Sequence, residues 1–440
     1  MSADEVSQKF TEDPPATPSG RAGKRLIGID AARGLALVGL MAIHLFPSED
    51  EVTQEPTLAW NLFSGDSAAL FALLAGMGLA LSSGGSAPHR GKRMTGDRIG
   101  LAARAVVIGS IGLVISAILP WDPPAYGILV YYAVFFLMTI PFLHLRPLML
   151  FLSAAAFSII APILHQLLGP VLPESSAWNH TVVNLVTEPL GTASELLLTG
   201  SYPALAYMTY LLVGLGLGRL NLRSIRVQGL ITGTGAALAV LANLASSLLL
   251  KVAGGYEALL ATPGMTSSDL ERALTFGPDE ISDPSAWWLA IATPHTNTPL
   301  AIAASLGMGL LVTGVFLLIA PKAGQWLKPL AAMGAMTLTL YSAHLIALAP
   351  ELHYDEPALW FVLHLITAAG FAWVWHRKFG QGPLERMVAA AARNAKQTVK
   401  DETTDATPAA PATGLPDAPK ADPLLGSGRD RRDGSDSGRQ

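Results

Sequence analysis

Long apolar stretches separated by short polar segments recur along most of the chain. A helix needs about 20 mostly apolar residues to cross the hydrocarbon core of a bilayer. Stretches of this length or slightly shorter span residues 26–46, 67–83, 99–119, 128–143, 148–168, 202–218, 228–250, 298–320, 330–348 and 358–375. The pattern predicts an all-α, polytopic integral membrane protein of about ten transmembrane helices.

The Lys and Arg residues between these stretches alternate with acidic residues from one connection to the next. Basic connections contain Arg21, Lys24, Arg25, Arg90, Lys92, Arg93, Arg98, Arg146, Arg219, Arg223, Arg226, Lys322, Lys328, Arg377 and Lys378. Acidic connections contain Glu49, Asp50, Glu51, Glu55, Asp122, Glu174, Glu188, Glu195, Glu351, Asp355 and Glu356, with Lys251 and Arg272 as the basic exceptions. Because cytoplasmic loops carry an excess of Lys and Arg, the pattern predicts that both ends of the chain are cytoplasmic and that the protein lies in the plasma membrane.

The ends and the longest connections have a different composition. Residues 1–23 and 396–440 are polar and rich in Pro, Ala, Asp or Ser, which predicts disordered cytoplasmic tails around a helical domain at 24–395. The connections 169–201 and 252–297 are too long for turns, and we expect them to form a lid on the outer side.

The overall composition excludes several classes of function. Of the 440 residues, 51% are hydrophobic and 14% charged, and the net charge of −4 gives no basic field for a nucleic-acid partner. No cysteine is present, so disulfides and thiolate metal sites are excluded. No His-Glu-x-x-His pattern or calcium-type carboxylate series occurs, and we expect no metal.

The first apolar stretch contains two charged side chains and a histidine, which are costly in hydrocarbon and usually face a protein interior. Arg33 and His44 are eleven residues apart, so they share one helix face and lie about 16 Å apart along its axis. Asp30 is placed to pair with Arg33. The spacing suits a guanidinium that holds an anionic group inside and an imidazole that accepts a proton outside. It is equally consistent with a structural ion pair and an interhelical hydrogen bond.

The run from Ile29 to Ala36 followed by His44 resembles the first helix of transmembrane acyltransferases, where an Arg precedes a His by eleven positions. It also resembles the YeiB-like family and relatives of heparan-α-glucosaminide N-acetyltransferase. Further matches lie at 71–81, 211–219, 334–344 and 382–386. In the relatives of the heparan enzyme a histidine is expected in the connection after the first helix, and residues 47–66 contain none.

This resemblance implies acyl transfer from cytoplasmic acyl-coenzyme A, most simply acetyl-coenzyme A, to a sugar hydroxyl or amine of an extracytoplasmic glycan or glycolipid. It assigns Arg33, with Asp30, to the coenzyme side and His44 to the role of catalytic base. Arg90 and Arg93 would bind the coenzyme phosphates, although a basic loop is also the ordinary topological signal.

Other polar residues are expected at the depth of His44. Tyr341 and His344 share a helix face, and Asp66 begins the second stretch, so we assign all three to the catalytic group. Trp60, His295 and Asn297 are assigned to acceptor binding. The alternatives are an interhelical hydrogen bond for His344, a helix cap for Asp66 and a simple turn around His295.

Two other functions remain open from the sequence. A proton-coupled transporter or exporter would use the same buried His and Arg as a substrate site, and a non-catalytic partner in a cell-envelope assembly would use the C-terminal tail for contact. His353, His364 and His376, on the last stretch and its entrance, are interpreted as interface and helix-end residues.

Overall fold

The computed structural model describes residues 26–278 and 285–401. Nearly all of this fold belongs to the first of two compact units, residues 1–400. The predicted N-terminal tail lies outside the described residues, and so does the predicted C-terminal tail beyond Asp401. Within the described part, every regular element is a helix and the only β pairing is an isolated bridge between Glu49 and Pro56, so the all-helical prediction is confirmed.

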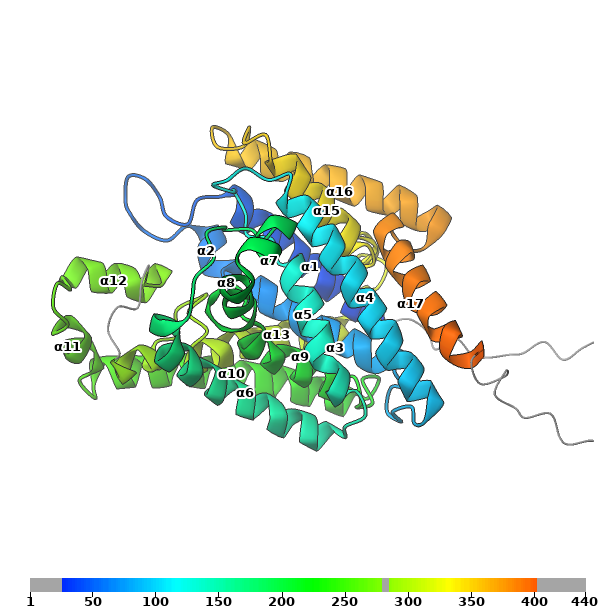
Figure 1. The fold of residues 1–440 in the computed structure, drawn as a ribbon. Helices are drawn as coiled ribbons and strands as arrows, with labels where there is room; N and C mark the ends of the chain where they lie inside the picture. The colour runs from blue at the N-terminus through cyan, green and yellow to red at the C-terminus, as the bar shows by residue number, and fades with distance from the viewer. Residues whose placement is uncertain (1–25, 279–284, 402–440) are drawn as a thin grey trace, which may run out of the picture. The chain divides into compact units, whose positions relative to one another are not determined.

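Each predicted apolar stretch contains a helix (Figure 1). The main helices are α1 (Ile27–Leu45), α3 (Asp66–Ser82), α4 (Lys92–Ser116), α5 (Leu129–Thr139), α6 (Pro147–Leu168), α9 (Ala204–Leu217), α10 (Ile225–Lys251), α13 (Pro299–Ala323), α15 (Thr337–Leu348), α16 (Pro357–Phe379) and α17 (Pro383–Asp401). Shorter helices are α2 (Leu58–Phe63), α7 (Val182–Thr187), α8 (Pro189–Ser194), α11 (Gly255–Leu260), α12 (Ser267–Phe276) and α14 (Lys328–Gly334).

In the described part of the chain, seven helices are long and apolar enough to span a membrane. The number rises to nine if each of two bent helix pairs counts as one span. One bent pair joins Pro189–Thr199 to α9 at 46°, and the other joins α14 to α15 at 78°. Pro203 directly precedes α9 and lacks the N–H that would continue a helix through the first bend. The predicted long connections contain α7 and α8, and α11 and α12, in place of structureless loops.

The start of α15 is held by a carboxylate from the C-terminal helix α17. Thr339 donates its backbone N–H and its hydroxyl to Glu385, at 3.1 and 2.6 Å, and Leu384 donates its N–H to the Thr339 hydroxyl at 3.1 Å. The first N–H groups of a helix have no partner within the helix, so Glu385 satisfies donors that the bend at Met336 exposes. The C-terminal helix therefore fixes where α15 begins.

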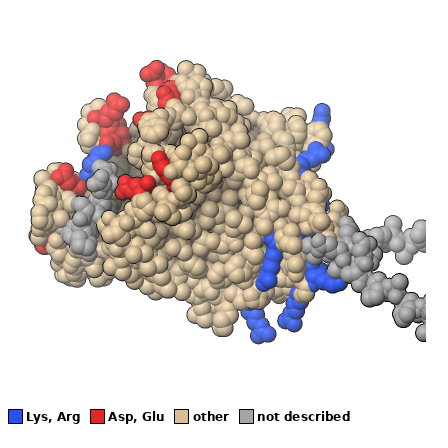
Figure 2. Space-filling model, viewed as in Figure 1, with Lys and Arg blue, Asp and Glu red and all other residues tan. Residues whose placement is uncertain are grey.

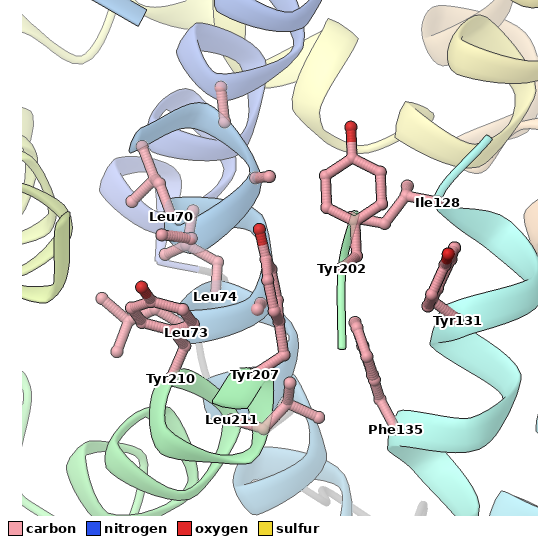
Figure 3. Packing of buried hydrophobic residues seen from close by; sticks show 14 of the residues in the cluster. Leu70, Leu73, Leu74, Ile128, Tyr131, Phe135, Tyr202, Tyr207, Tyr210 and Leu211 are labelled. Carbon is pink, nitrogen blue, oxygen red and sulfur yellow. The ribbon is translucent and has the colours of Figure 1, made fainter. Parts of the chain in front are cut away.

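Glycines allow the central helices to pack backbone against backbone, as is common between membrane helices. A Cβ on Gly34 would overlap the Leu330 carbonyl, and one on Gly334 would overlap the Asp30 carbonyl, so α1 and α14 are in close contact. The same relation holds between α3 and α9. Figure 3 shows the leucines of α3 facing the Tyr210 and Leu211 side of α9.

Arg219 is a structural anchor at the end of α9, where the sequence indicated only a topological charge. Its side chain is buried and donates to the carbonyls of Ala80, Ser83, Gly85 and Leu143 and to the Ser83 hydroxyl. A guanidinium offers five donors in a fixed plane. Arg219 therefore joins the ends of α3 and α9 to the segment after α5.

Acidic and basic side chains gather on opposite sides of the unit (Figure 2). We call the connections 46–57, 172–188 and 349–356 the acidic end, and the connections 83–91, 143–146, 218–224 and 376–382 the basic end. The α1 helix runs between them, with Arg33 toward the basic end and His44 at the acidic end.

The close packing of α1 on α14 can be tested with two glycine variants. We expect Gly334→Ala to lower the thermal midpoint of the detergent-solubilised protein by several °C, because overpacking costs about 1–3 kcal/mol. Gly233→Ala on α10 is the matched control, since a Cβ there meets nothing within 4 Å. Equal midpoints for the two variants would contradict the backbone contact.

Candidate functional site

Arg33 lies in the part of the site toward the basic end and has partners on two helices. Its guanidinium donates to the Asp30 carboxylate at 3.3 Å and to the Leu74 carbonyl on α3 at 3.0 Å. The predicted Asp30–Arg33 pair is therefore present. Gly78 makes room for the guanidinium, because a Cβ there would lie 2.9 Å from Arg33 Nη2. The arginine thus points from α1 into the contact with α3.

Two further polar side chains converge on this region from α4 and α5. Arg104 lies within electrostatic range of Arg33, and so does Tyr132. The Tyr132 hydroxyl is buried and has no hydrogen-bond partner among the described residues. An orphaned buried hydroxyl costs free energy unless a ligand or water satisfies it. This part of the site therefore holds one unused hydroxyl donor close to two guanidinium groups, which suits an anionic ligand.

A small cavity of about 50 Å³ opens beside Arg104 at the basic end, between α3, α4 and α17. Lys396 and His89 both contact the Asp97 carboxylate there, each at 2.6 Å. Lys396 lies in α17, at the position where the sequence predicted the disordered tail to begin. Arg90 and Arg93 lie at the same end with exposed side chains.

At the acidic end, three histidines from three helices form a hydrogen-bonded chain. His44 Nδ1 on α1 lies 3.2 Å from His344 Nε2 on α15. His344 Nδ1 lies 2.8 Å from His364 Nδ1 on α16. The rings of His44 and His344 are stacked at 5.4 Å with 8° between their planes. The interhelical hydrogen bond considered for His344 is therefore present, and its partner is the predicted base.

Further polar groups surround this chain. The Tyr341 ring lies 6.2 Å from the His44 ring, and its hydroxyl is 3.5 Å from the Ile128 N–H, which donates to it. His295 and His353 are within electrostatic range of His44. Burial lowers the pKa of His353 from its ordinary value, opposed by Glu351. Five of the ten histidines in the chain thus gather at one end of α1.

Asp66 belongs to a separate cluster. Its carboxylate lies near the Ser305 side chain on α13, and Tyr210 on α9 lies near the same serine. The N-cap residue of α3 is Gly65, and no side chain caps the helix. Asp66 is therefore an interhelical contact of α3 and lacks the exposed cap geometry that the sequence allowed.

Of the three residues assigned to acceptor binding, His295 and Asn297 lie in the loop before α13, and Trp60 on α2 lies against that loop. The rings of Trp60 and His295 lie 6.0 Å apart, and Trp60 Nε1 donates to the Thr275 carbonyl at 3.3 Å. His295 and Asn297 have φ angles of 65° and 52°, which non-glycine residues adopt only at a cost of about 1–3 kcal/mol. Such strain is concentrated at functional sites.

Sequence reasoning assigned His364 to interface chemistry, and the structure instead places it in direct contact with His344. The sequence gives little indication of this contact, because His364 follows His344 by twenty residues and lies on the next helix. Pairing across two helices depends on the bend before α15, which hydropathy does not reveal. Among the described residues, no group of three or more His, Asp or Glu side chains is arranged to hold a metal ion.

Comparison with known proteins identifies one matching family. A family model described as heparan-alpha-glucosaminide N-acetyltransferase, catalytic, matches residues 25–250, which is more than half of the chain and confirms the resemblance inferred from the first helix. No curated protein matches the sequence. The matched region contains Arg33, Tyr132 and His44, whereas Tyr341, His344 and His364 lie beyond it.

An exposed ion pair links the connection 46–57 to α12, and it predicts a pH dependence. Arg272 on α12 donates to both carboxylate oxygens of Glu49, at 2.5 and 3.0 Å, and these bonds hold the pKa of Glu49 below its usual value of 4.5. A depressed folded-state pKa stabilises the fold above the unfolded-state pKa, and this stabilisation is lost as the pH falls through the folded-state value.

We therefore expect Glu49→Gln to raise hydrogen–deuterium exchange in residues 46–57 and in α12 at pH 7. The difference from the unmodified protein, measured at each pH, should vanish as the pH falls through the lowered pKa of Glu49, where protonation removes the ion pair. Glu51→Gln is the control, because Glu51 has no ion pair among the described residues. A difference that persists in acid would rule out the ion pair as the link.

Proposed function

The chain belongs to the heparan-α-glucosaminide N-acetyltransferase family, and on this premise we propose that it moves an acyl group across the plasma membrane. The donor is cytoplasmic acyl-coenzyme A, most simply acetyl-coenzyme A. The acceptor is a sugar amine or hydroxyl of an extracytoplasmic glycan or glycolipid. The observation that supports this proposal is the His44–His344 contact at one end of α1 with Arg33 on the same helix face.

A line of polar side chains joins the two ends of this site through an otherwise apolar bundle. Arg104 and Arg33 lie at the inner end, and Tyr132 is within electrostatic range of both Arg33 and Tyr341. Tyr341 in turn contacts the His44 ring. An extended donor whose anionic part rests on the arginines would present its thioester near His44, about 16 Å farther along α1.

Each end supplies a different part of the chemistry. Arg33 and Arg104 would bind the anionic groups of the donor by charge-assisted hydrogen bonds, and the unpaired Tyr132 hydroxyl would donate to it. The Nε2 atom of His44 has no partner among the described residues and is available to take the proton of the acceptor as it attacks the thioester carbonyl. The strained loop with His295 and Asn297, together with Trp60 on α2, would hold the sugar.

The proposal includes a topology. Counting each bent pair once and adding the shorter apolar helix Leu129–Phe142 gives ten crossings, and an even number places both ends on one side. The excess of Lys and Arg at the basic end makes that side cytoplasmic. The acidic end, with His44, then faces outward.

The roles of Arg33 and His44 can be separated by one donor-binding and one turnover measurement. We expect acetyl-coenzyme A to raise the thermal midpoint of the purified protein, because a ligand that binds only the folded state stabilises it. Arg33→Ala should need at least ten times more acetyl-coenzyme A for the same rise of the thermal midpoint, since a charge-assisted bond contributes about 1.5–3 kcal/mol. His44→Ala should keep the stabilisation while coenzyme A release falls by about 10²–10⁴-fold.

Arg226→Ala is the matched control, because Arg226 is an exposed basic residue near the start of α10. It should leave both measurements unchanged. Unaltered coenzyme A release in a folded His44→Ala variant would refute the catalytic assignment.

The absence of cysteine makes the topology directly testable. We expect a membrane-impermeant maleimide to label Val52→Cys in intact cells, since Val52 is 90% exposed at the acidic end. Ser86→Cys, exposed at the basic end, should be labelled only after the membrane is permeabilised. The reverse result would invert the proposed orientation.

A proton-coupled transporter is the second candidate. Chains of ionisable residues and broken helices are typical of transporters, and the histidine chain and the two bent helix pairs fit that description. Stabilisation by acyl-coenzyme A favours the enzyme. Stabilisation by a solute, with none by the coenzyme, would favour transport.

A further inference from the structure

The contacts of His344 constrain the protons of all three histidines in the chain. A neutral imidazole has one N–H donor and one acceptor nitrogen. Both nitrogens of His344 face another ring nitrogen, at 3.2 Å on the His44 side and 2.8 Å on the His364 side. His344 must therefore donate to one neighbour and accept from the other. The chain has two neutral arrangements that differ only in the direction of every hydrogen bond.

In the first arrangement His44 donates from Nδ1 to His344, and His344 donates from Nδ1 to His364. The Nε2 atom of His44 then carries a lone pair and is the basic atom of the site. In the second arrangement both bonds are reversed, and His44 Nε2 carries a proton that it can donate. Uptake of a proton at His44 Nε2, transfer along both hydrogen bonds and release of a proton from His364 Nε2 convert the first arrangement into the second.

We propose that His364 is the terminal member of a proton relay, His44–His344–His364, which takes the acceptor proton during acyl transfer. This inference rests on the proposed function and adds a positioning residue that acts through His344. Acyl transfer needs a place for the acceptor proton while the new bond forms, and a protonated imidazole is costly in a desolvated site. The relay carries that charge from His44 to a different helix.

The proton balance of the step is complete within the three rings and the two substrates. As the acceptor nitrogen or oxygen attacks the thioester carbonyl, its proton moves to His44 Nε2. The Nδ1 proton of His44 passes to His344 Nε2, the Nδ1 proton of His344 passes to His364 Nδ1, and His364 becomes the imidazolium. When the carbon–sulfur bond breaks, the reverse sequence returns a proton from His44 Nε2 to the thiolate, which leaves as the thiol.

The environment of the rings favours His364 as the site of charge. His344 is only 3% exposed, whereas His364 is partly exposed at the surface of the bundle, so His364 is the ring of this pair that groups outside the bundle can reach. The Trp360 ring lies edge-on to His364 at 6.1 Å.

No carboxylate competes for the proton within the described residues. The titratable neighbours of the chain are Tyr341 on α15, His295 in the loop before α13, and His353 in the connection before α16. Glu351 is within electrostatic range of His353. No Asp or Glu side chain in the described chain is hydrogen-bonded to His44, His344 or His364.

His364→Asn is the sharpest single test. The asparagine amide can occupy the position of the imidazole Nδ1 and hydrogen-bond to His344, but it cannot take up a proton at neutral pH. We expect its thermal midpoint and the KM values for donor and acceptor to stay near those of the unmodified protein. The maximal rate of coenzyme A release should fall by about 10²-fold.

Chemical rescue separates a proton carrier from a packing residue. We expect the rate of His364→Ala to fall by a similar factor and to recover when imidazole is added to the buffer, because His364 is partly exposed at the surface of the bundle, where added imidazole can enter the vacated position. His376→Ala, at the opposite end of the same helix, is the matched control and should neither lose activity nor respond to imidazole. Full activity in His364→Asn, or no response of His364→Ala to imidazole, would overturn the relay.

The hydrogen-bonded chain can also be tested without turnover. In protein labelled with ¹⁵N-histidine, we expect a through-bond nitrogen–nitrogen coupling across the His344–His364 contact, absent in His364→Ala. If the unmodified protein releases no coenzyme A with any acyl donor, the proposed function fails, and this spectrum still decides whether the chain exists. A missing coupling in the unmodified protein would refute the relay even in an active enzyme.

Discussion

The cost of placing ionisable side chains inside an apolar bundle determines the arrangement around α1. Arg33 and His44 lie in a helix that is otherwise almost entirely apolar, and each must find polar partners within the protein. Arg33 finds them in the Leu74 carbonyl on α3 and in Asp30, and His44 finds one in His344 on α15. These contacts set the rotation and depth of α1 relative to α3 and α15.

The position of His344 depends in turn on how α15 begins. The 78° bend between α14 and α15 exposes backbone donors that an unbroken helix would satisfy, and Glu385 accepts one of them together with the Thr339 hydroxyl. The site is therefore built from distant parts of the chain. The region matched by the family model supplies Arg33, Tyr132 and His44, and the C-terminal region supplies the rings that orient His44.

Much of this arrangement could be predicted from the sequence, because apolar length and helical periodicity are local properties. The apolar stretches identified every main helix except α17, and the eleven-residue spacing placed Arg33 and His44 on one face. The contacts of His364 and Asp66 could not be predicted, since they depend on helix bends and interhelical packing. Lys396 shows the same limit: composition predicted disorder from this residue onward, whereas α17 continues to Asp401 and Lys396 forms an ion pair with Asp97.

The choice of imidazole as the partner of His44 has a physical consequence that a carboxylate would not share. A buried carboxylate would carry a full charge before the reaction starts, at a cost of several kcal/mol. A neutral histidine orients His44 equally well through one hydrogen bond and introduces no charge until the acceptor is deprotonated. Asp66, the carboxylate that the sequence assigned to this group, lies instead near Ser305 and Tyr210. A site built from neutral rings is thus compatible with hydrocarbon in its resting state, and in the proposed reaction it would become charged only while the acyl group moves.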